Sequence, residues 1–376
     1  MHRPDYGVAV TPASPSRTSS TAAPEGAEAV AWFAGVHARR VVECVDVAAE
    51  PERIAAGGFW VVVGDFEGPV RAWRFADVVR APLRTRQPLW RGPAHGAWST
   101  SMDREAYCEG VAEVRRRIWE GDVYQVNLCR VLEAPLGPTA GAEPSAVGLA
   151  ARLAEGNPAP YAGGIHVPAG TDVPPVWVVS ASPELFLRLD GTGSIASGPI
   201  KGTAATPDGL TDKDRAENVM IADMVRNDLQ RVCAPGTVEV TDLLALEHHP
   251  GLVHLVTTVQ GRLRTDPAPS WSQILSATYP PASVSGAPKS SALEAITALE
   301  PVPRGPYCGA FGWVDADAGR AEVAVGIRTF WWTAEGGGRL RFGTGAGLTW
   351  GSDAAAEWAE TELKAHRLIG LASAPS

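Results

Sequence analysis

The stretch Val176-Trp-Val-Val-Ser-Ala-Ser-Pro-Glu-Leu-Phe-Leu-Arg-Leu-Asp-Gly191 decides the fold class of this chain. Two runs of apolar and β-branched residues, 176–182 and 185–189, are separated by Ser-Pro-Glu, and Asp-Gly follows the second run. Short apolar runs bounded by turn residues are typical of β-strands, and Asp-Gly is typical of a hairpin. This stretch therefore predicts antiparallel strands.

The same pattern continues on both sides of that stretch. Strand-like runs cover 58–64 and 70–75, then 310–315 with 321–327, and 328–333 with 339–343, each later pair being joined by a glycine-containing turn. Helical patterns cover about 104–120, 213–232, 289–299 and 353–369. Hairpin strands interspersed with long helices predict an α+β fold with antiparallel sheets, not a parallel doubly wound fold.

The chain has no obvious internal boundary after its first residues. Residues 1–28 are rich in Pro, Ser, Thr and Ala and have no apolar period, which predicts a disordered tail. No linker divides the remainder, so we expect residues 29–376 to form a single domain.

Composition excludes several classes of partner. The 33 Lys and Arg against 42 Asp and Glu give a net charge of −9, which opposes binding to nucleic acid. No apolar run approaches the roughly 18 residues that span a bilayer, so we expect no membrane partner. The five cysteines are an odd number without a C-x-x-C pair, which favours neither a disulfide framework nor a zinc site and is typical of a cytoplasmic protein.

The helix predicted at 213–232 carries an acidic residue on its apolar side. Glu217 lies one turn before the predicted core residues of this helix, which are Met220, Ile221, Met224 and Leu229. A carboxylate directed inward needs a proton, a cation or a metal. Taken alone, the position is equally compatible with a surface pair between Glu217 and Lys213 or Arg215.

A second acidic group lies on the helix that begins near Ser352-Asp353. Glu357, Glu360 and Lys364 share one face of that helix, where Glu360 and Lys364 are spaced for an ordinary ion pair. Carboxylates from two different helices are also a donor set for a hard cation such as Mg²⁺. Spacing alone leaves both interpretations open.

Two further segments have the composition of a binding site. Gly343-Thr-Gly-Ala-Gly-Leu-Thr-Trp-Gly351 precedes the last helix as a flexible run whose N–H groups are suited to a small carboxylate, although it is neither a P-loop nor a dinucleotide fingerprint. Lys201 stands in the tight segment 197–203. Such a lysine is usually solvated, but a lysine beside carboxylates and a metal is a candidate nucleophile.

Taken together, these segments resemble the chorismate-utilising enzymes, of the anthranilate synthase component I type, and within them the aminodeoxychorismate synthase component I branch. The resemblance spans roughly 119–368. The matching stretches are Tyr124-Gln-Val-Asn-Leu128, Ser182-Pro-Glu-Leu-Phe186, Pro199-Ile-Lys-Gly-Thr203, Asp214-Arg-Ala-Glu-Asn218, Arg226-Asn-Asp228, His254-Leu-Val256, Ser285-Gly-Ala-Pro-Lys289, Cys308-Gly309, Ile327-Arg-Thr329, Gly345-Ala-Gly347 and Glu357-Trp-Ala-Glu-Thr361.

The resemblance implies a fold, a cofactor and roles for individual residues. It implies two large antiparallel sheets packed together with helices outside, and a Mg²⁺-dependent site for chorismate. Glu217 and Glu360, with Glu357, match the metal positions, and Glu184 matches the general acid that protonates the departing C4 hydroxyl. The positions that match substrate contacts are Thr203, His254, Arg328, Gly345, Ala346, Gly347 and Lys364.

Two positions discriminate between branches of this family. Isochorismate and salicylate synthases carry a water-activating lysine where this chain has Gln125, and anthranilate synthases typically have alanine where it has Lys201. The resemblance therefore implies a 4-amino-4-deoxychorismate synthase in which Lys201 adds to C2 before ammonia enters at C4, a step that leads to 4-aminobenzoate and folate. The alternatives are an anthranilate synthase component I and a non-catalytic chorismate-binding regulator.

The chain also departs from the family pattern. The common Pro-Gly-Gly-Ser is here Pro280-Pro-Ala-Ser283, and the part from 29 to 100 is shorter than in long members. No glutamine amidotransferase segment is recognisable in the sequence, so the resemblance implies that ammonia comes from a separate amidotransferase subunit.

Overall fold

The computed structural model describes residues 28–80, 89–204, 206–249 and 252–374. The predicted tail at 1–28 lies outside these residues except for its last position. Within them, none of the helices is long and apolar enough to cross a membrane.

Strands are the most abundant regular element of the described chain. Their bounds are β1 Val30–Phe33, β2 Val36–Asp46, β3 Phe59–Gly64, β4 Val70–Val79, β5 Ser99–Thr100, β6 Gln125–Pro135, β7 Tyr161–Val167, β8 Val176–Ser182, β9 Leu185–Asp190, β10 Ser194–Gly198, β11 Ile200–Ala204, β12 Glu239–His249, β13 Leu252–Arg262, β14 Gly286–Ala287, β15 Ala310–Asp315, β16 Arg320–Val325, β17 Thr329–Thr333 and β18 Arg339–Leu348. The helices are α1 Pro51–Ala55, α2 Arg104–Glu120, α3 Ala146–Gly156, α4 Asp212–Gln230, α5 Trp271–Thr278, α6 Lys289–Leu299 and α7 Ala354–Ala372. The predicted helices correspond to α2, α4, α6 and α7.

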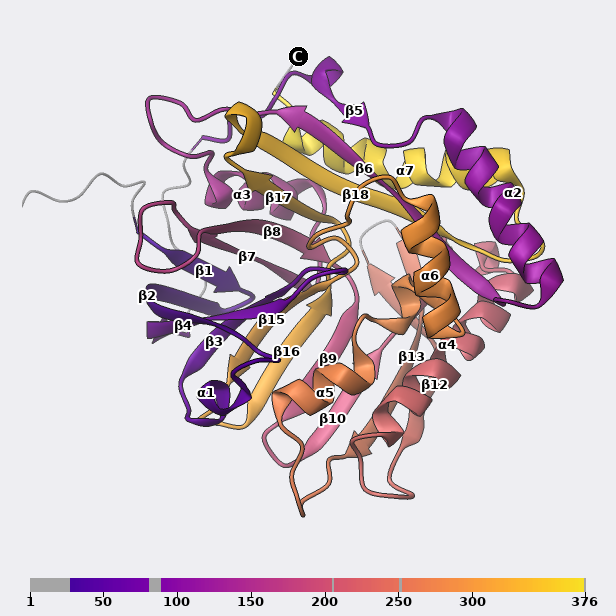
Figure 1. The fold of residues 1–376 in the computed structure, drawn as a ribbon, viewed down its shortest axis with the longest axis horizontal. Coiled ribbons are helices and arrows are strands. Elements are labelled where there is room, and N and C mark those ends of the chain that lie inside the picture. Colours follow the sequence, from indigo (N-terminus) through magenta and orange to yellow (C-terminus); the bar gives the residue numbers. More distant parts are fainter. Residues whose placement is uncertain (1–27, 81–88, 205, 250–251, 375–376) are drawn as a thin grey trace, which may run out of the picture.

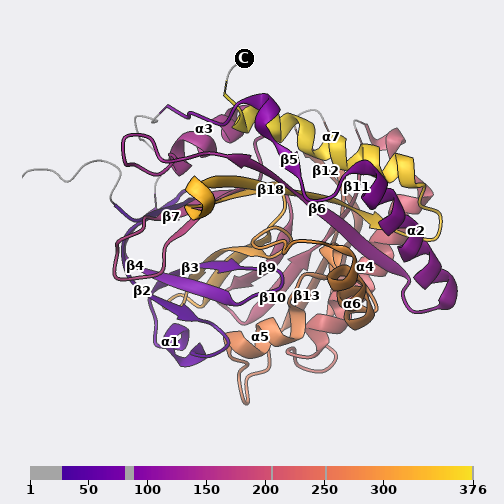
Figure 2. The ribbon, with the colours of Figure 1, turned by 45° about the horizontal axis from the view of Figure 1, so that its top comes forward.

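The predicted α+β class is confirmed, with every strand pair antiparallel. Hydrogen bonds join the strands in the order β12, β13, β10 with β11, β9, β16, β15, β3, β4, β2, β1, β7, β8, β17, β18, β6. The two predicted sheets are therefore parts of one continuous series. In Figure 2, β6 and β18 lie above β9, β10 and β13. Apolar side chains from these upper and lower strands belong to one core, for example Leu128 and Leu348 with Leu187 and Ile195.

The stretch 176–191 contains β8 and β9, which are not neighbours in this series of strands. The Asp190-Gly191 turn joins β9 to β10 as predicted, but β8 does not pair with β9: β8 pairs with β17, and β9 pairs with β16. The link between β8 and β9 runs beside the link between β16 and β17, because the N–H of Ala181 bonds to the carbonyl of Arg328 and the N–H of Val325 bonds to the carbonyl of Glu184. Glu184 and Arg328 thus lie at one crossover.

The glycine-rich run before the last helix corrects a prediction. Residues 343–348 are not a flexible loop; they continue β18, which pairs without interruption with β6 from Arg339–Pro135 to Leu348–Val126. Composition suggested a loop because glycines weaken a strand. Here they are required by close packing, since a β-carbon on Gly343 would lie 2.0 Å from the Tyr307 ring and one on Gly345 would lie 2.5 Å from the sulfur of Cys129.

Helices cover the outside of the sheet series and bring in the acidic residues. In Figure 1, α7 and α2 lie along β18 and β6, and both contact these strands. Helix α4 packs on β13 and β11. It begins with a capping box between Thr211 and Asp214, and Ile221 and Leu229 are buried while Met220 and Met224 are partly buried against the same core. The predicted core side of α4 is confirmed.

Candidate active site

Lys201 lies where three strands come together. It is on β11, and its Nζ is 3.1 Å from the point at which a β-carbon on Gly347 of β18 would lie. The side-chain amide nitrogen of Gln125, from β6, is 2.6 Å from that same point. Lys201 therefore faces the strand pair β6–β18 and is not the solvated turn residue that its local sequence allowed.

The surroundings of Lys201 lower the pKa of its ammonium group. Burial lowers the pKa of its ammonium group. Glu217 opposes that shift, Lys364 adds to it, and Glu184 and Glu360 oppose it more weakly. Four of the predicted site residues, from α4, α7 and the crossover, thus act electrostatically on Lys201. A lysine whose pKa is lowered is a better nucleophile near neutral pH.

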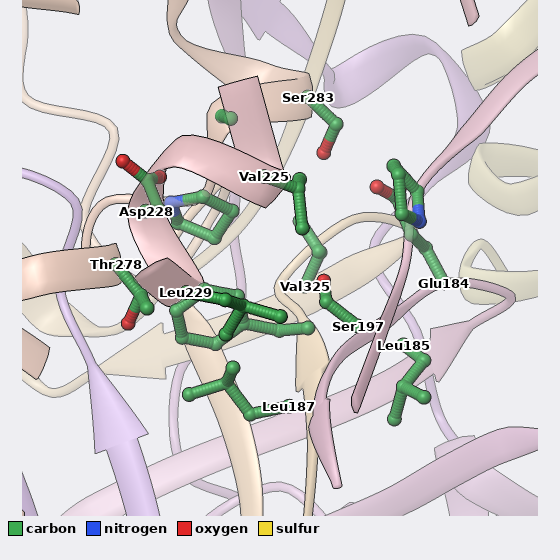
Figure 3. A pocket seen from close by; sticks show the side chains of 14 residues that line it. Glu184, Leu185, Leu187, Ser197, Val225, Asp228, Leu229, Thr278, Ser283 and Val325 are labelled. Carbon is green, nitrogen blue, oxygen red and sulfur yellow. The ribbon is translucent and has the colours of Figure 1, made fainter. Parts of the chain in front are cut away.

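Glu184 is a buried carboxyl group with the properties of an acid. It is 3% exposed, and burial raises its pKa to about 7, against the opposing effects of the Ser283 hydroxyl, Lys201 and the backbone N–H of Ile200. Figure 3 shows Glu184 and Ser283 on the wall of one small pocket. A carboxyl group with a pKa near neutrality can hold a proton and deliver it, as a general acid must.

Glu217 and Glu357 face each other across a lysine. The Nζ of Lys213 is 3.7 Å from Oε1 of Glu217 and 3.7 Å from Oε1 of Glu357. The surface pair considered from the sequence is therefore present for Lys213, but the Glu217 side chain is only 15% exposed and the Glu357 side chain only 7%. Burial raises the pKa of Glu217, with Lys201 and Lys213 opposing that shift.

Glu360 and Lys364 form the ion pair that their spacing suggested. Lys364 Nζ is 2.6 Å from Glu360 Oε1 and also donates to the carbonyl oxygen of Gly345 at 3.0 Å. Desolvation would raise the pKa of Glu360, but Lys364, together with Lys201 and Lys213, outweighs this effect and the pKa is lowered. Lys364 thus connects α7 to β18 at Gly345 through a hydrogen bond.

The remaining predicted substrate positions lie on neighbouring backbone. Thr203 of β11 is directly opposite His254 of β13, and His254 is 1% exposed. Arg328 sits at the crossover with a positive φ of 52°, and burial lowers the pKa of its guanidinium. Ala346 is fully buried in the main core, opposite Leu128 of β6.

The acidic residues suit Mg²⁺ as a donor set, although they do not form a finished site. Among the described residues, no three acidic, histidine or cysteine side chains converge closely enough to hold a metal ion. The buried Oε1 of Glu217 nevertheless has no hydrogen-bond partner there, and Glu357 lies against the same ammonium group. Mg²⁺ binds through one or two carboxylates and keeps water or substrate oxygens, so Glu217 and Glu357 have the donor chemistry that this ion requires, whereas Glu360 is paired with Lys364.

Two residues of the site were not predicted from sequence. Lys213 was considered only as a surface partner of Glu217, and Ser283 only as part of an altered turn. Lys213 meets Glu357 from a helix more than a hundred residues away, and Ser283 meets Glu184 from a distant 3₁₀ turn. No local signal marks either contact.

Comparison with known proteins places this arrangement in a family. The family model described as chorismate binding enzyme matches residues 67–370. An aminodeoxychorismate synthase of Streptomyces griseus is 36% identical over 83% of this chain, and an anthranilate synthase component 1 of Streptomyces coelicolor is 34% identical over 78%. The aminodeoxychorismate synthase component 1 of Salmonella typhimurium is 35% identical over 79%. The chain covers 43%, 60% and 63% of these three relatives, respectively.

Solved structures agree with the fold. A structure from Bacillus anthracis described as a 2,3-dihydroxybenzoate-specific isochorismate synthase has a TM-score of 0.74 and 25% identity, covering 92% of this chain and 96% of that one. Anthranilate synthase component I from Streptococcus pneumoniae has a TM-score of 0.70 and 21% identity, covering 96% and 95%. The chain belongs to the chorismate-binding enzyme family. Relatives of two activities match it almost equally well, so identity alone does not separate them.

Proposed function

We propose that this protein is the chorismate-aminating component of a 4-amino-4-deoxychorismate synthase. The observation that carries the proposal is the position of Lys201: its Nζ faces Gly347 and Gln125, and its charged form is disfavoured by burial. In the proposed reaction a nucleophilic lysine at position 201 attacks C2, whereas in the alternative, anthranilate synthase activity, ammonia is added directly at C2.

Two groups of this chain, the Lys201 amine and the Glu184 carboxyl group, act as nucleophile and acid in the proposed reaction. The neutral amine of Lys201 attacks C2 of chorismate while the ring double bonds shift and the C4 hydroxyl, protonated by Glu184, leaves as water. Ammonia then adds at C4 and expels the lysine from C2, which restores the free amine after proton loss. The net change is chorismate plus ammonia to 4-amino-4-deoxychorismate plus water.

Other residues have binding roles in the proposal. Arg328 and the backbone of 345–347, with Lys364, bind the carboxylates of the substrate, because guanidinium and ammonium groups pair strongly with carboxylate. His254 and Thr203, which are opposite each other on β13 and β11, complete the proposed binding positions. Glu217, Glu357 and Glu360 hold Mg²⁺, which in this role neutralises a substrate carboxylate.

The proposal includes a source of ammonia and a place of action. A separate glutamine amidotransferase subunit supplies the ammonia, as the component 1 names of the relatives suggest. The protein acts in the cytoplasm and its product serves 4-aminobenzoate and folate synthesis.

Product identification tests the proposal. The protein is incubated with chorismate, Mg²⁺ and an ammonium salt, with and without an aminodeoxychorismate lyase, and the products are separated by chromatography. We expect 4-amino-4-deoxychorismate, converted to 4-aminobenzoate by the lyase, and no product with glutamine alone. Anthranilate as the main product would assign the alternative activity, and binding of chorismate without turnover would assign a regulator.

A further inference from the structure

A small buried cavity lies beside Glu184. It is lined by the crossover, β10, α4 and the turn at 282–284, and its polar lining residues are Glu184, Ser197, Asp228, Thr278 and Ser283. The space open to the centre of a water molecule is about 20 Å³. This exceeds the ~10–15 Å³ that one buried water needs, so the cavity can hold a single water molecule beside polar groups.

The Glu184 carboxyl group has unmet hydrogen-bonding capacity. Its Oε1 is buried without a hydrogen-bond partner among the residues that the structure describes. The groups set against the carboxyl are the Ser283 hydroxyl and the N–H of Ile200. A buried carboxyl oxygen without a partner is costly, and an ordered water is the usual way to satisfy it.

A hydroxyl is suited to an acid that changes its protonation state. The Ser283 hydroxyl can donate to the ionised carboxylate, and after rotation it can accept from the protonated acid. The N–H of Ile200 can only donate. It can donate to the carboxylate and to the carbonyl oxygen of the protonated acid, but it cannot accept the acid proton. Of these two contacts, Ser283 is therefore the one that can accept that proton.

At the opposite end of the cavity, the carboxylate of Asp228 forms an ion pair with the ammonium group of Lys289. Figure 3 shows Asp228 and Thr278 on the side away from Glu184 and Ser283, with Val225 and Val325 between them. Lys289 donates to Asp228 at 2.7 Å and to the carbonyl of Thr278 at 3.1 Å. The charged groups that face Glu184 are thus Lys201 from β11 and, across the cavity, the Asp228–Lys289 pair of α4 and α6.

We propose that Ser283 is a positioning residue for Glu184, and that its hydroxyl, together with one water molecule in this cavity, holds the buried carboxyl group in both protonation states. The inference rests on the proposed function only in naming Glu184 as the acid. It assigns a role to Ser283, the last residue of the turn at 280–283, in which Pro281 and Ala282 depart from the family pattern.

The test compares Ser283→Ala with Ser283→Thr, which keeps the hydroxyl, and with Ser290→Ala on the exposed start of α6. Infrared difference spectra of the buried carboxyl group are recorded against pH, with Glu184→Gln to assign the band, and the pH dependence of kcat is measured in parallel. Loss of a donor to the carboxylate disfavours the charged form. We therefore expect Ser283→Ala to move the titration of Glu184 and the alkaline limb of kcat to higher pH, with kcat about tenfold lower and KM changed less than about twofold.

Ser283→Thr should titrate like the unsubstituted protein, and Ser290→Ala should change nothing. A Ser283→Ala protein with the unchanged Glu184 titration and kcat would overturn the inference. Should Ser283→Ala fail to fold, Ser283→Cys replaces it, because its weak S–H donor should give the same shift in direction. The infrared titration needs no turnover, so it stands or fails separately from the identity of the product.

Discussion

Lys201 Nζ faces Gly347: a β-carbon at position 347 would lie 3.1 Å from the amine and 2.6 Å from the amide nitrogen of Gln125. The absence of a side chain at Gly347 thus leaves space that the ends of the Lys201 and Gln125 side chains approach. Residues of β11, β6 and β18 are therefore close together in the candidate site.

Gly347→Ala should impair catalysis more than folding. The new methyl group would displace Gln125 and Lys201, whose flexible ends can move, so we expect kcat at least about tenfold lower and a free energy of unfolding within about 1 kcal/mol of the original. Steady-state kinetics and urea unfolding measure both. Gly351→Ala is the matched control, because a β-carbon there meets no atom within 4 Å. Equal kinetics for the two variants would show that the space at 347 has no catalytic role.

Glu217→Gln and Glu360→Gln should weaken the binding of Mg²⁺ itself. Each amide keeps the shape of the side chain and removes an anionic oxygen ligand, so we expect at least about a tenfold loss of affinity by isothermal titration calorimetry. Glu155→Gln, at an exposed position of α3, serves as the control. Unchanged affinity in both site variants would remove these residues from the metal site.

Glu184 should make the stability of the protein depend on pH. Its pKa is about 7 in the folded protein against an ordinary 4.5, so between these values the folded state binds the extra proton and stability falls as pH rises. Relative to Glu184→Gln, the unsubstituted protein should lose up to about 3 kcal/mol of unfolding free energy from pH 4.5 to 7. Parallel pH dependences in urea titrations of the two proteins would contradict the raised pKa.

The ion pair Asp228–Lys289 joins two of the segments that carry the family resemblance, Arg226-Asn-Asp228 and Ser285-Gly-Ala-Pro-Lys289. Asp228→Asn would leave the partly buried ammonium of Lys289 without its carboxylate, and we expect a loss of about 2–4 kcal/mol in unfolding free energy. Adding Lys289→Met should recover part of that loss. Asp223→Asn, on the same helix but in an exposed pair with Arg226, should change stability by less than about 1 kcal/mol. An Asp228→Asn protein as stable as this control would show that the pair contributes little.

Local elements were predictable because their signals are local. The helix predicted at 104–120 matches α2, whose first turn is capped by Asp103 and whose end is fixed by Gly121 with a φ of 84°. The hairpin after Asp190 and the helix at 289–299 were predicted for the same reason. Periodicity and turn residues report what the chain does over ten to twenty positions.

Contacts between distant strands were not predictable from these patterns. Periodicity gave no register for β18 on β6, so glycines that lie in a tightly packed strand were interpreted as a flexible run. The pairing of β8 with β17, the shared lysine between Glu217 and Glu357, and the approach of Ser283 to Glu184 likewise depend on tertiary arrangement. The roles of individual site residues came from the family resemblance and remain predictions until tested.

The most direct test of the account is the covalent state of Lys201. The protein is incubated with chorismate and Mg²⁺ without ammonia. The mass of the intact protein is then measured, and peptide mapping locates any adduct. We predict a mass increase equal to chorismate minus one water, located on the peptide that contains Lys201, absent in Lys201→Ala and lost with release of 4-amino-4-deoxychorismate when ammonium is added. Absence of the adduct, together with 4-amino-4-deoxychorismate formation by Lys201→Ala at the unchanged rate, would contradict a nucleophilic role for this lysine.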